Sequence, residues 1–303
     1  MFTSAWGAAI TKSPGIQLRT AGECDIVVKI SGCTPEGRGT IRMLLAPIVW
    51  LLTIVICYFF IAKTWWFPPP ISQHGIAYDE QFMRTLVITG VIFFLAQFAL
   101  GWVILRYRDD GRRASYSHGN NKWETIWTTA TAFLFIGIVL MGTHIWAAVH
   151  LSEPDPHAVP IEVMTKQFAF TFRYPGPDGK FGRTDLKLVN DAAGNPMGLD
   201  DKDPAGKDDI VSASLKVPAG KPIKLILHSR DVIHNFFVRE LRLKQDIVPG
   251  MEIPLYFQAD TPGTYEIPCS ELCGLGHFQM RSTMQVMSEA DFEKWKQEQA
   301  ANK

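Results

Sequence analysis

Three long uncharged stretches dominate the hydrophobic pattern of the first half of the chain. They cover residues 43–62, 85–105 and 126–149. Each is long enough to cross a hydrocarbon core of about 30 Å as a helix. Buried helices of soluble proteins usually keep a polar face, whereas these stretches are apolar all round and have tryptophans such as Trp66 and Trp123 near their ends. We therefore predict three transmembrane helices.

The charges flanking these stretches predict their orientation. The N-terminal segment 1–42 carries five Lys and Arg residues, the second connection carries five more, and the first connection has only two. The positive-inside bias then assigns the N-terminus and the second connection to the cytoplasm and residues 153–303 to the outer face. The first apolar stretch is too long, and too far from the start of the chain, for a cleaved signal peptide, and we interpret it as a retained helix.

The last half of the chain has a different pattern, with short apolar runs separated by Pro and Gly. Residues 161–172 alternate and would set Phe168, Phe170 and Phe172 on one face of a strand. Several short strands with turn signals between them predict an all-β, antiparallel sandwich or barrel with Greek-key connections. The other predicted strands cover residues 213–217, 223–228, 236–243, 253–258, 263–267 and 283–287.

Two further segments of this half have no strand pattern. Ser288 followed by Asp291 predicts a capped C-terminal helix with Phe292 and Trp295 on one face. Residues 175–209 are rich in Gly, Pro and Asp and predict a long surface loop. The spacing of its aspartates matches no calcium loop, and we expect a solvated acidic loop rather than a cation site.

Charge and cysteine content narrow the class of protein. The total formal charge is zero, but residues 1–149 carry net +4 and residues 150–303 net −4, which indicates two different environments. We expect no nucleic-acid partner. Five cysteines are too few for a disulfide scaffold, and no C-x-x-C-H motif for covalent haem is present. Cys24 and Cys33, on the cytoplasmic side, are expected to be free thiols without an assigned function.

The remaining cysteine pair lies among other metal-binding side chains. Residues 269–280 read CSELCGLGHFQM, which includes Cys269, Cys273, His277 and Met280, and His234 lies in a turn upstream. Two thiolates, two imidazoles and a thioether form a soft ligand set that favours copper. A single-copper blue site needs only one cysteine, so the second indicates a pair of copper ions bridged by both thiolates. A disulfide or a Cys2His2 zinc site is the alternative, but neither gives Met280 a role.

These segments together resemble cytochrome c oxidase subunit II. The likeness is carried by residues 269–280, by DVIH at 231–234 with LKQD at 243–246 and PG at 249–250, and by ETIWT at 124–128. It extends over about residues 80–288. It implies a helical hairpin over residues 85–149 followed by an exported cupredoxin-like domain over residues 153–303. The segment 1–42 and the helix at 43–62 are additional to it.

The resemblance also implies roles for the metal-binding residues. Cys269 and Cys273 would bridge both copper ions of a binuclear CuA centre, and His234 and His277 would each bind one. Met280 would complete one ion and the backbone carbonyl of Glu271 the other. The side chain of Glu271 would reach toward a magnesium ion at the interface with the catalytic subunit.

Two residues outside this set receive a second interpretation. Glu124 resembles a carboxylate at the mouth of a proton pathway, but Asn121 followed by Glu124 is equally a capping pair at a helix start. Phe168 stands where the family has the tryptophan at which the cytochrome delivers its electron. Its alternative role is that of a core residue.

The resulting functional expectation is a non-catalytic, electron-accepting subunit of a proton-translocating terminal oxidase. Its partners would be the haem-bearing subunit I, other oxidase subunits, membrane lipid and an external c-type cytochrome, free or held by another membrane complex. We place it in a bacterial plasma membrane with the copper domain on the periplasmic face. A quinol-oxidase subunit would lack the copper ligands, and nitrous oxide reductase carries the motif in a longer soluble chain. The remaining alternative is a membrane-tethered copper carrier outside an oxidase.

Overall fold

The structure, a computed structural model, describes residues 35–64, 66–108, 116, 118–151, 155–200 and 202–301. For residues 35–43 it describes the backbone only. Cys24 and Cys33, with the N-terminal segment through residue 34, lie outside the described residues, as does the predicted start of the exported domain at 153.

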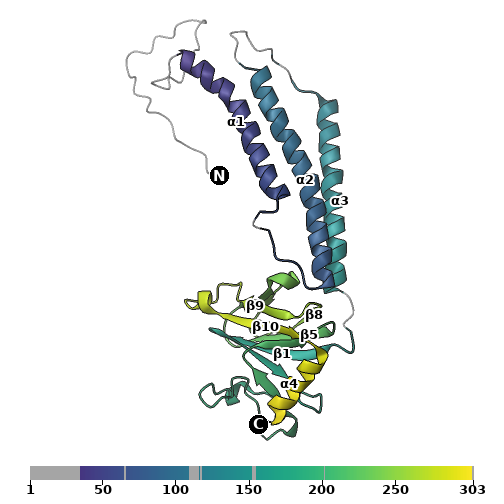
Figure 1. The fold of residues 1–303 in the computed structure, drawn as a ribbon, viewed down its shortest axis with the longest axis vertical. Helices are drawn as coiled ribbons and strands as arrows, with labels where there is room; N and C mark the ends of the chain where they lie inside the picture. Colours follow the sequence, from purple (N-terminus) through teal and green to yellow (C-terminus); the bar gives the residue numbers. More distant parts are fainter. Residues whose placement is uncertain are drawn as a thin grey trace, which may run out of the picture.

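Three long helices form one end of the molecule, and a β domain forms the other (Figure 1). The helices are α1 (Pro35–Ile61), α2 (Gln73–Arg106) and α3 (Asn121–His150). All three are long and apolar enough to cross a membrane, which confirms the predicted spans. The helix α2 begins well before the expected residue 85, because Ser72 caps it by accepting a hydrogen bond from the backbone N–H of Gly75.

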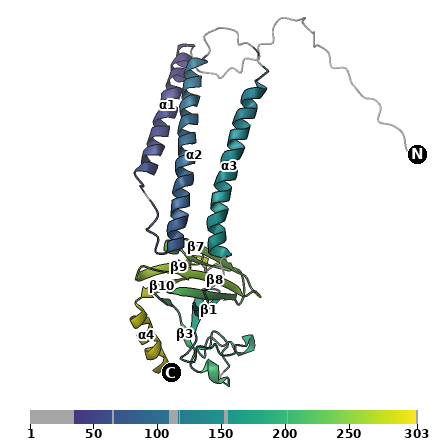
Figure 2. The same ribbon diagram turned by 90° about the vertical axis from the view of Figure 1, so that its right-hand side faces the viewer.

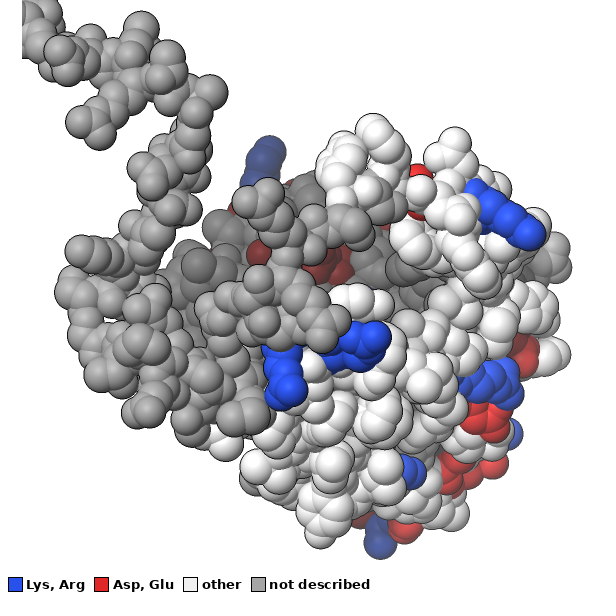
Figure 3. All heavy atoms as spheres, turned by 90° about the horizontal axis from the view of Figure 1, so that it is seen from above, with Lys and Arg blue, Asp and Glu red and all other residues white. Residues whose placement is uncertain are grey.

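The first two helices pack against each other more closely than either packs on the third. The ring of Trp50 on α1 stacks on Phe98 at 5.0 Å, and its Nε1 donates to the Phe98 carbonyl at 3.1 Å. Gly101 makes this approach possible, since an added Cβ would lie 2.3 Å from Trp50 Nε1. No residue of α3 is buried, and α3 stands apart from α1 in both side views (Figures 1 and 2). Seen from above, most of the described surface in Figure 3 is uncharged, with Lys, Arg, Asp and Glu in separate patches.

The β domain is a sandwich of short strands with mixed pairing. A five-stranded sheet has the order β3-β2-β1-β5-β8, a three-stranded sheet the order β4-β10-β9, and β6 pairs with β7. The strands are β1 (Val159–Lys166), β2 (Ala169–Tyr174), β3 (Ile210–Ser212), β4 (Leu215–Pro218), β5 (Pro222–Ser229), β6 (His234–Val238), β7 (Leu243–Ile247), β8 (Ile253–Gln258), β9 (Gly263–Pro268) and β10 (Arg281–Met287). The sandwich confirms the predicted fold class. The expectation of antiparallel pairing was wrong for β1 with β5 and for β4 with β10, which are parallel.

Two of the predicted strands are each divided in two by a turn. The run 161–172 is a hairpin of β1 and β2 that turns at Gln167 and Phe168, so Phe168 does not share the buried face of Phe170 and Phe172. The run 236–243 breaks at the short 3₁₀ turn η3 (Arg239–Leu241). The strand β3 was missed because only three residues pair, at the end of a long loop.

The C-terminal helix α4 (Glu289–Ala301) closes one side of the sandwich, as predicted. Ser288 Oγ accepts from the backbone N–H of Asp291 at 3.1 Å and caps it. Phe292 and Trp295 pack against the buried ring of Tyr174. The helix therefore covers the edge of the core farthest from the membrane helices (Figure 2).

The acidic loop 175–209 is more structured than the sequence indicates. Asp185 and Asp203 cap its two short 3₁₀ turns, η1 (Leu186–Leu188) and η2 (Pro204–Gly206). Asp209 is fully buried and pairs with the buried guanidinium of Arg173 at 3.4 Å. The expectation of a wholly solvated loop was therefore wrong at Asp209, because its carboxylate balances a charge inside the domain.

Candidate metal centre

One loop between neighbouring strands supplies four of the predicted ligand residues. It connects β9 to β10, and its ends are held together because Cys269 N–H donates to the Met280 carbonyl at 2.9 Å. The 3₁₀ turn η4 (His277–Gln279) folds the second half of the loop back toward the first. Cys269, Cys273 and Met280 are buried, and His277 is half-buried.

The ligand atoms of this loop converge on one small space. The sulfurs of Cys269 and Cys273 lie 3.9 Å apart. Cys273 Sγ also lies 3.7 Å from His277 Nδ1 and 3.7 Å from Met280 Sδ. Cys269 Sγ lies 3.2 Å from the Glu271 carbonyl oxygen. The backbone carbonyl of Glu271 is thus part of the site.

His234, the remaining predicted ligand, comes from the two-stranded sheet of β6 and β7. It opens β6, is fully buried, and its Nδ1 lies 4.0 Å from Cys269 Sγ. Each imidazole therefore turns Nδ1 toward a different cysteine. His228, the alternative ligand in the sequence, lies within β5 and is not among the clustered residues.

Two neighbouring residues, Asp231 and Gln167, orient these ligands, and neither was assigned a role from the sequence. The carboxylate of Asp231 accepts from His234 Nε2 at 2.8 Å and from the backbone N–H of Gln167 at 2.7 Å. The Gln167 amide donates to the Cys273 carbonyl at 2.5 Å. Gly274 has φ +136°, and a Cβ there would lie 2.6 Å from Gln167 Nε2. Asp231, three residues before His234, was the one available sequence signal, since metal-bound histidines usually donate to a carboxylate or carbonyl.

The pKa values of the two thiols shift in opposite directions. Burial raises the pKa of Cys269, but hydrogen bonds with His234 and with the backbone at Glu271 and Asn235 outweigh it and lower the pKa. Burial and the negative charge on Cys269 raise the pKa of Cys273. Cys269 therefore loses its proton first, and a metal that binds both sulfurs must displace the proton of Cys273.

Phe168 lies directly against the ligand loop. A Cβ on Gly276 would lie 2.5 Å from the Phe168 ring, and one on Gly274 would lie 3.2 Å from it. The ring is 39% exposed. The core interpretation was therefore wrong for Phe168, which forms part of the surface over the cluster.

Glu124 and the Glu271 side chain stand apart from the cluster. Glu124 is exposed in the first turn of α3, where Asn120, not Asn121, is the capping residue. Within the described ranges, the only group of three or more His, Cys, Asp or Glu side chains able to share an ion is His234, Cys269 and Cys273. The Glu271 side chain is not a member of this group.

The donor set fits copper. Two thiolates, two imidazole Nδ1 atoms, a thioether and a carbonyl oxygen combine soft ligands with a weak one, in a buried site at one end of a sandwich. Zinc would be satisfied by two Cys and two His and would leave Met280 unexplained. Fold and site together define a membrane-anchored protein with a cupredoxin-like copper domain.

Comparisons with known proteins agree with this class. Residues 201–287 match the family model described as cytochrome C oxidase subunit II, periplasmic domain. The chain is 34% identical to the alternative cytochrome c oxidase subunit 2 of Bradyrhizobium diazoefficiens, over 85% of this chain and 92% of that one. It is 30% identical to cytochrome c oxidase subunit 2 of Thermostichus vulcanus, over 77% of this chain and 78% of that one. The chain belongs to the cytochrome c oxidase subunit II family.

A solved structure is also similar in part. The periplasmic domain of subunit II (CoxB) of Bradyrhizobium japonicum matches 50% of this chain and 99% of its own length, with 24% identity and a TM-score of 0.37.

Proposed function

We propose that this chain accepts electrons from a c-type cytochrome at a binuclear copper centre and passes them to the haem-bearing subunit of a terminal oxidase, which reduces oxygen to water. The observation that carries the proposal is the pair of cysteine sulfurs 3.9 Å apart, each faced by the Nδ1 of a different histidine. That arrangement suits two ions that share both thiolates. When bound, the copper pair takes up and releases one electron.

The chain's own residues would hold this centre with little rearrangement. Cys269 and Cys273 would bridge the ions, with His234 and His277 one on each. Met280 and the Glu271 carbonyl would complete the set. The hydrogen bonds of Asp231 and Gln167 already fix His234 and the Cys273 backbone, and a fixed shell keeps the ligands in place as the charge changes.

The test is purification of the complex from its native membrane. We expect haem to copurify with the chain, and metal analysis of the chain to give two copper ions. Copper without any haem-bearing subunit would favour the alternative, a tethered copper carrier. One copper, or zinc after copper loading, would contradict the binuclear centre.

The exposed surface beside the cluster supports an external electron donor. The ligand loop against which Phe168 lies also carries exposed apolar side chains, with Leu275 98% and Phe278 75% exposed. Asp191 of the acidic loop reaches the same end of the domain, where it pairs with Lys166 at 2.6 Å and Arg230 at 3.2 Å. The carboxylate offsets part of the positive charge of these two side chains, which would otherwise repel a basic cytochrome more strongly, and charge complementarity mainly raises the association rate.

Phe168→Ala is expected to slow reduction of the copper by the cytochrome roughly tenfold or more, because small displacements of reacting groups are costly in rate. The copper spectrum should not change, since the ring lies against Gly274 and Gly276 of the ligand loop and supplies no ligand atom. Stopped-flow absorbance measures the rate. An unchanged rate would mean that electrons reach the centre elsewhere.

Glu124 is proposed to lie at the mouth of a proton pathway into the catalytic subunit. Its exposed carboxylate at the cytoplasmic start of α3 supports that role, although an anion is also favoured there by the helix dipole. The magnesium ion at the subunit interface, bound through Glu271, is likewise a proposal that depends on ligands from the partner subunit.

Glu124→Ala is expected to slow oxidase turnover while copper reduction by the donor stays unchanged. Asn120→Ala is the matched control, since it removes the cap of the same helix, at a cost of about 0.5–2 kcal/mol in stability. Oxygen consumption and thermal unfolding of the complex separate the two effects. If both variants lose only stability, Glu124 has no role in proton uptake.

A further inference from the structure

The copper domain is attached to the membrane helices by non-covalent contacts as well as by the chain that follows α3. The contacts made by Pro68, Ile71 and Asp79 together form a joint between the two parts. The connector between α1 and α2 runs along the domain, and Ile71 inserts into its core with 5% exposure. Its N–H donates to the Glu240 carbonyl at 3.0 Å, and its carbonyl accepts from the N–H of Asp260 at 2.7 Å. Ile71 is thus bonded between two parts of the copper domain like an added strand residue.

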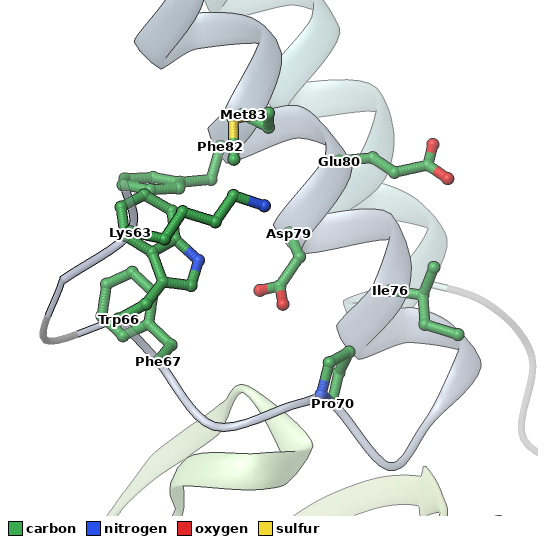
Figure 4. Close-up of a pocket in the computed structure, with 9 residues that line it drawn as sticks. All are labelled: Lys63, Trp66, Phe67, Pro70, Ile76, Asp79, Glu80, Phe82 and Met83. Atoms are coloured by element: carbon green, nitrogen blue, oxygen red, sulfur yellow. The ribbon is translucent and has the colours of Figure 1, made fainter. Parts of the chain in front are cut away.

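Arg242 closes this joint from the side of the copper domain. Its guanidinium donates to both oxygens of the Asp79 carboxylate on α2, at 2.7 and 2.9 Å, and to the Pro68 carbonyl at 2.6 Å. It also lies 5.7 Å from the centre of the Phe67 ring. Figure 4 shows Asp79 turned from α2 toward the connector that carries Phe67 and Pro70. In such a fork, two parallel hydrogen bonds from one guanidinium to one carboxylate fix the relative orientation of the two groups as well as their distance.

The backbone at Arg242 is unfavourable for a residue with a side chain. It has φ +56° and ψ +32°, a left-handed conformation that favours glycine. Glycine there would relieve the backbone but lose every contact to Asp79, Pro68 and Phe67. The side-chain contacts therefore explain why arginine stands at this position.

Arg242 is also close in sequence to the copper ligands. It links the turn η3 to β7, and β7 pairs residue by residue with β6, which begins at His234. The contacts of Arg242 and the ligand His234 therefore lie at opposite ends of one hairpin.

We propose that Arg242 is a positioning residue that locks the copper domain onto the α1–α2 connector and α2. It thereby sets where the centre stands over the partner subunit. The part of this proposal that concerns electron transfer rests on the proposed function.

The test compares variants in the assembled, copper-loaded complex. Arg242→Gly removes the fork and relieves the backbone, whereas Asp79→Asn removes only its charged partner. Arg239→Ala is the matched control, because its exposed guanidinium on the same turn pairs only with the neighbouring Glu240 among the described side chains.

The first readout is hydrogen exchange at the backbone amides of Ile71 and Asp260, which span the joint. We expect Arg242→Gly and Asp79→Asn to lower their protection about ten- to hundredfold, as for lost hydrogen bonds between charged groups. Arg239→Ala should leave it unchanged. Unchanged protection in both joint variants would overturn the proposal.

The second readout is the rate of electron transfer from copper to haem after flash reduction. We expect a loss of roughly tenfold or more in the joint variants with an unchanged copper spectrum. A normal rate despite lost protection would reduce Arg242 to a structural role and overturn the positioning claim. If Arg242→Gly does not assemble, Asp79→Asn decides by the same criteria. Failure of the proposed function itself would differ, since the wild-type complex would then show no copper-to-haem transfer.

Discussion

Cys273→Ser is expected to abolish the spectrum of a binuclear copper centre completely. Cys273 Sγ is in contact with Cys269 Sγ, His277 Nδ1 and Met280 Sδ, so its loss removes the atom on which the ligand set converges. A serine oxygen is a hard ligand and cannot share an electron between two copper ions as a thiolate can. Cys269→Ser should have the same effect. Copper analysis and electron paramagnetic resonance of the purified complex measure the outcome.

Cys57→Ser is the matched control for these variants. Cys57 lies on α1, away from the cluster, and is free. The substitution should leave both copper content and spectrum unchanged. A full binuclear spectrum in either site variant would contradict the bridging role of the cysteines.

Arg173→Leu is expected to destabilise the copper domain by about 3–5 kcal/mol, because it leaves a buried carboxylate without its cation. Arg173 is 1% exposed and pairs with Glu162 at 2.7 Å and Asp209 at 3.4 Å. Its Nη1 also donates to the Gly182 carbonyl at 3.0 Å, which ties the acidic loop to β2. Urea unfolding of the purified chain, followed by fluorescence of Trp295, measures the change.

An arginine of the acidic loop itself provides the contrast. Arg183 pairs with Asp200 at 2.5 Å, but its side chain is 70% exposed. Arg183→Ala should therefore leave the urea midpoint of unfolding almost unchanged. Equal losses of stability in the two variants would show that burial does not determine how much the ion pairs of Arg173 stabilise the domain.

The helices and the sulfur ligands could be predicted because each depends on local sequence. An uncharged run of more than eighteen residues has few alternatives to a membrane helix. Cys269, Cys273, His277 and Met280 lie in twelve consecutive residues, so their spacing alone brings them together.

The partners that cross between segments could not be predicted in this way. Gln167 reaches Cys273 across a separation of 106 residues, and only the pairing of the strands puts them in contact. Arg173 was not recognised as buried because a charged residue at a strand end is usually solvated. Phe168 appeared to continue an alternating strand, since periodicity does not reveal where a hairpin turns.

The loop between β9 and β10 has a consequence for how the protein matures. Its ends are neighbouring ladder positions of two strands, and the core of the sandwich is built almost entirely from residues of other segments. Leu272 and Leu275 of the loop are exposed, so the loop lies at the surface of the finished domain. Folding of the sandwich therefore does not have to wait for the metal. A metal ion could therefore be inserted late, into the folded domain, through this one surface loop and the turn before His234.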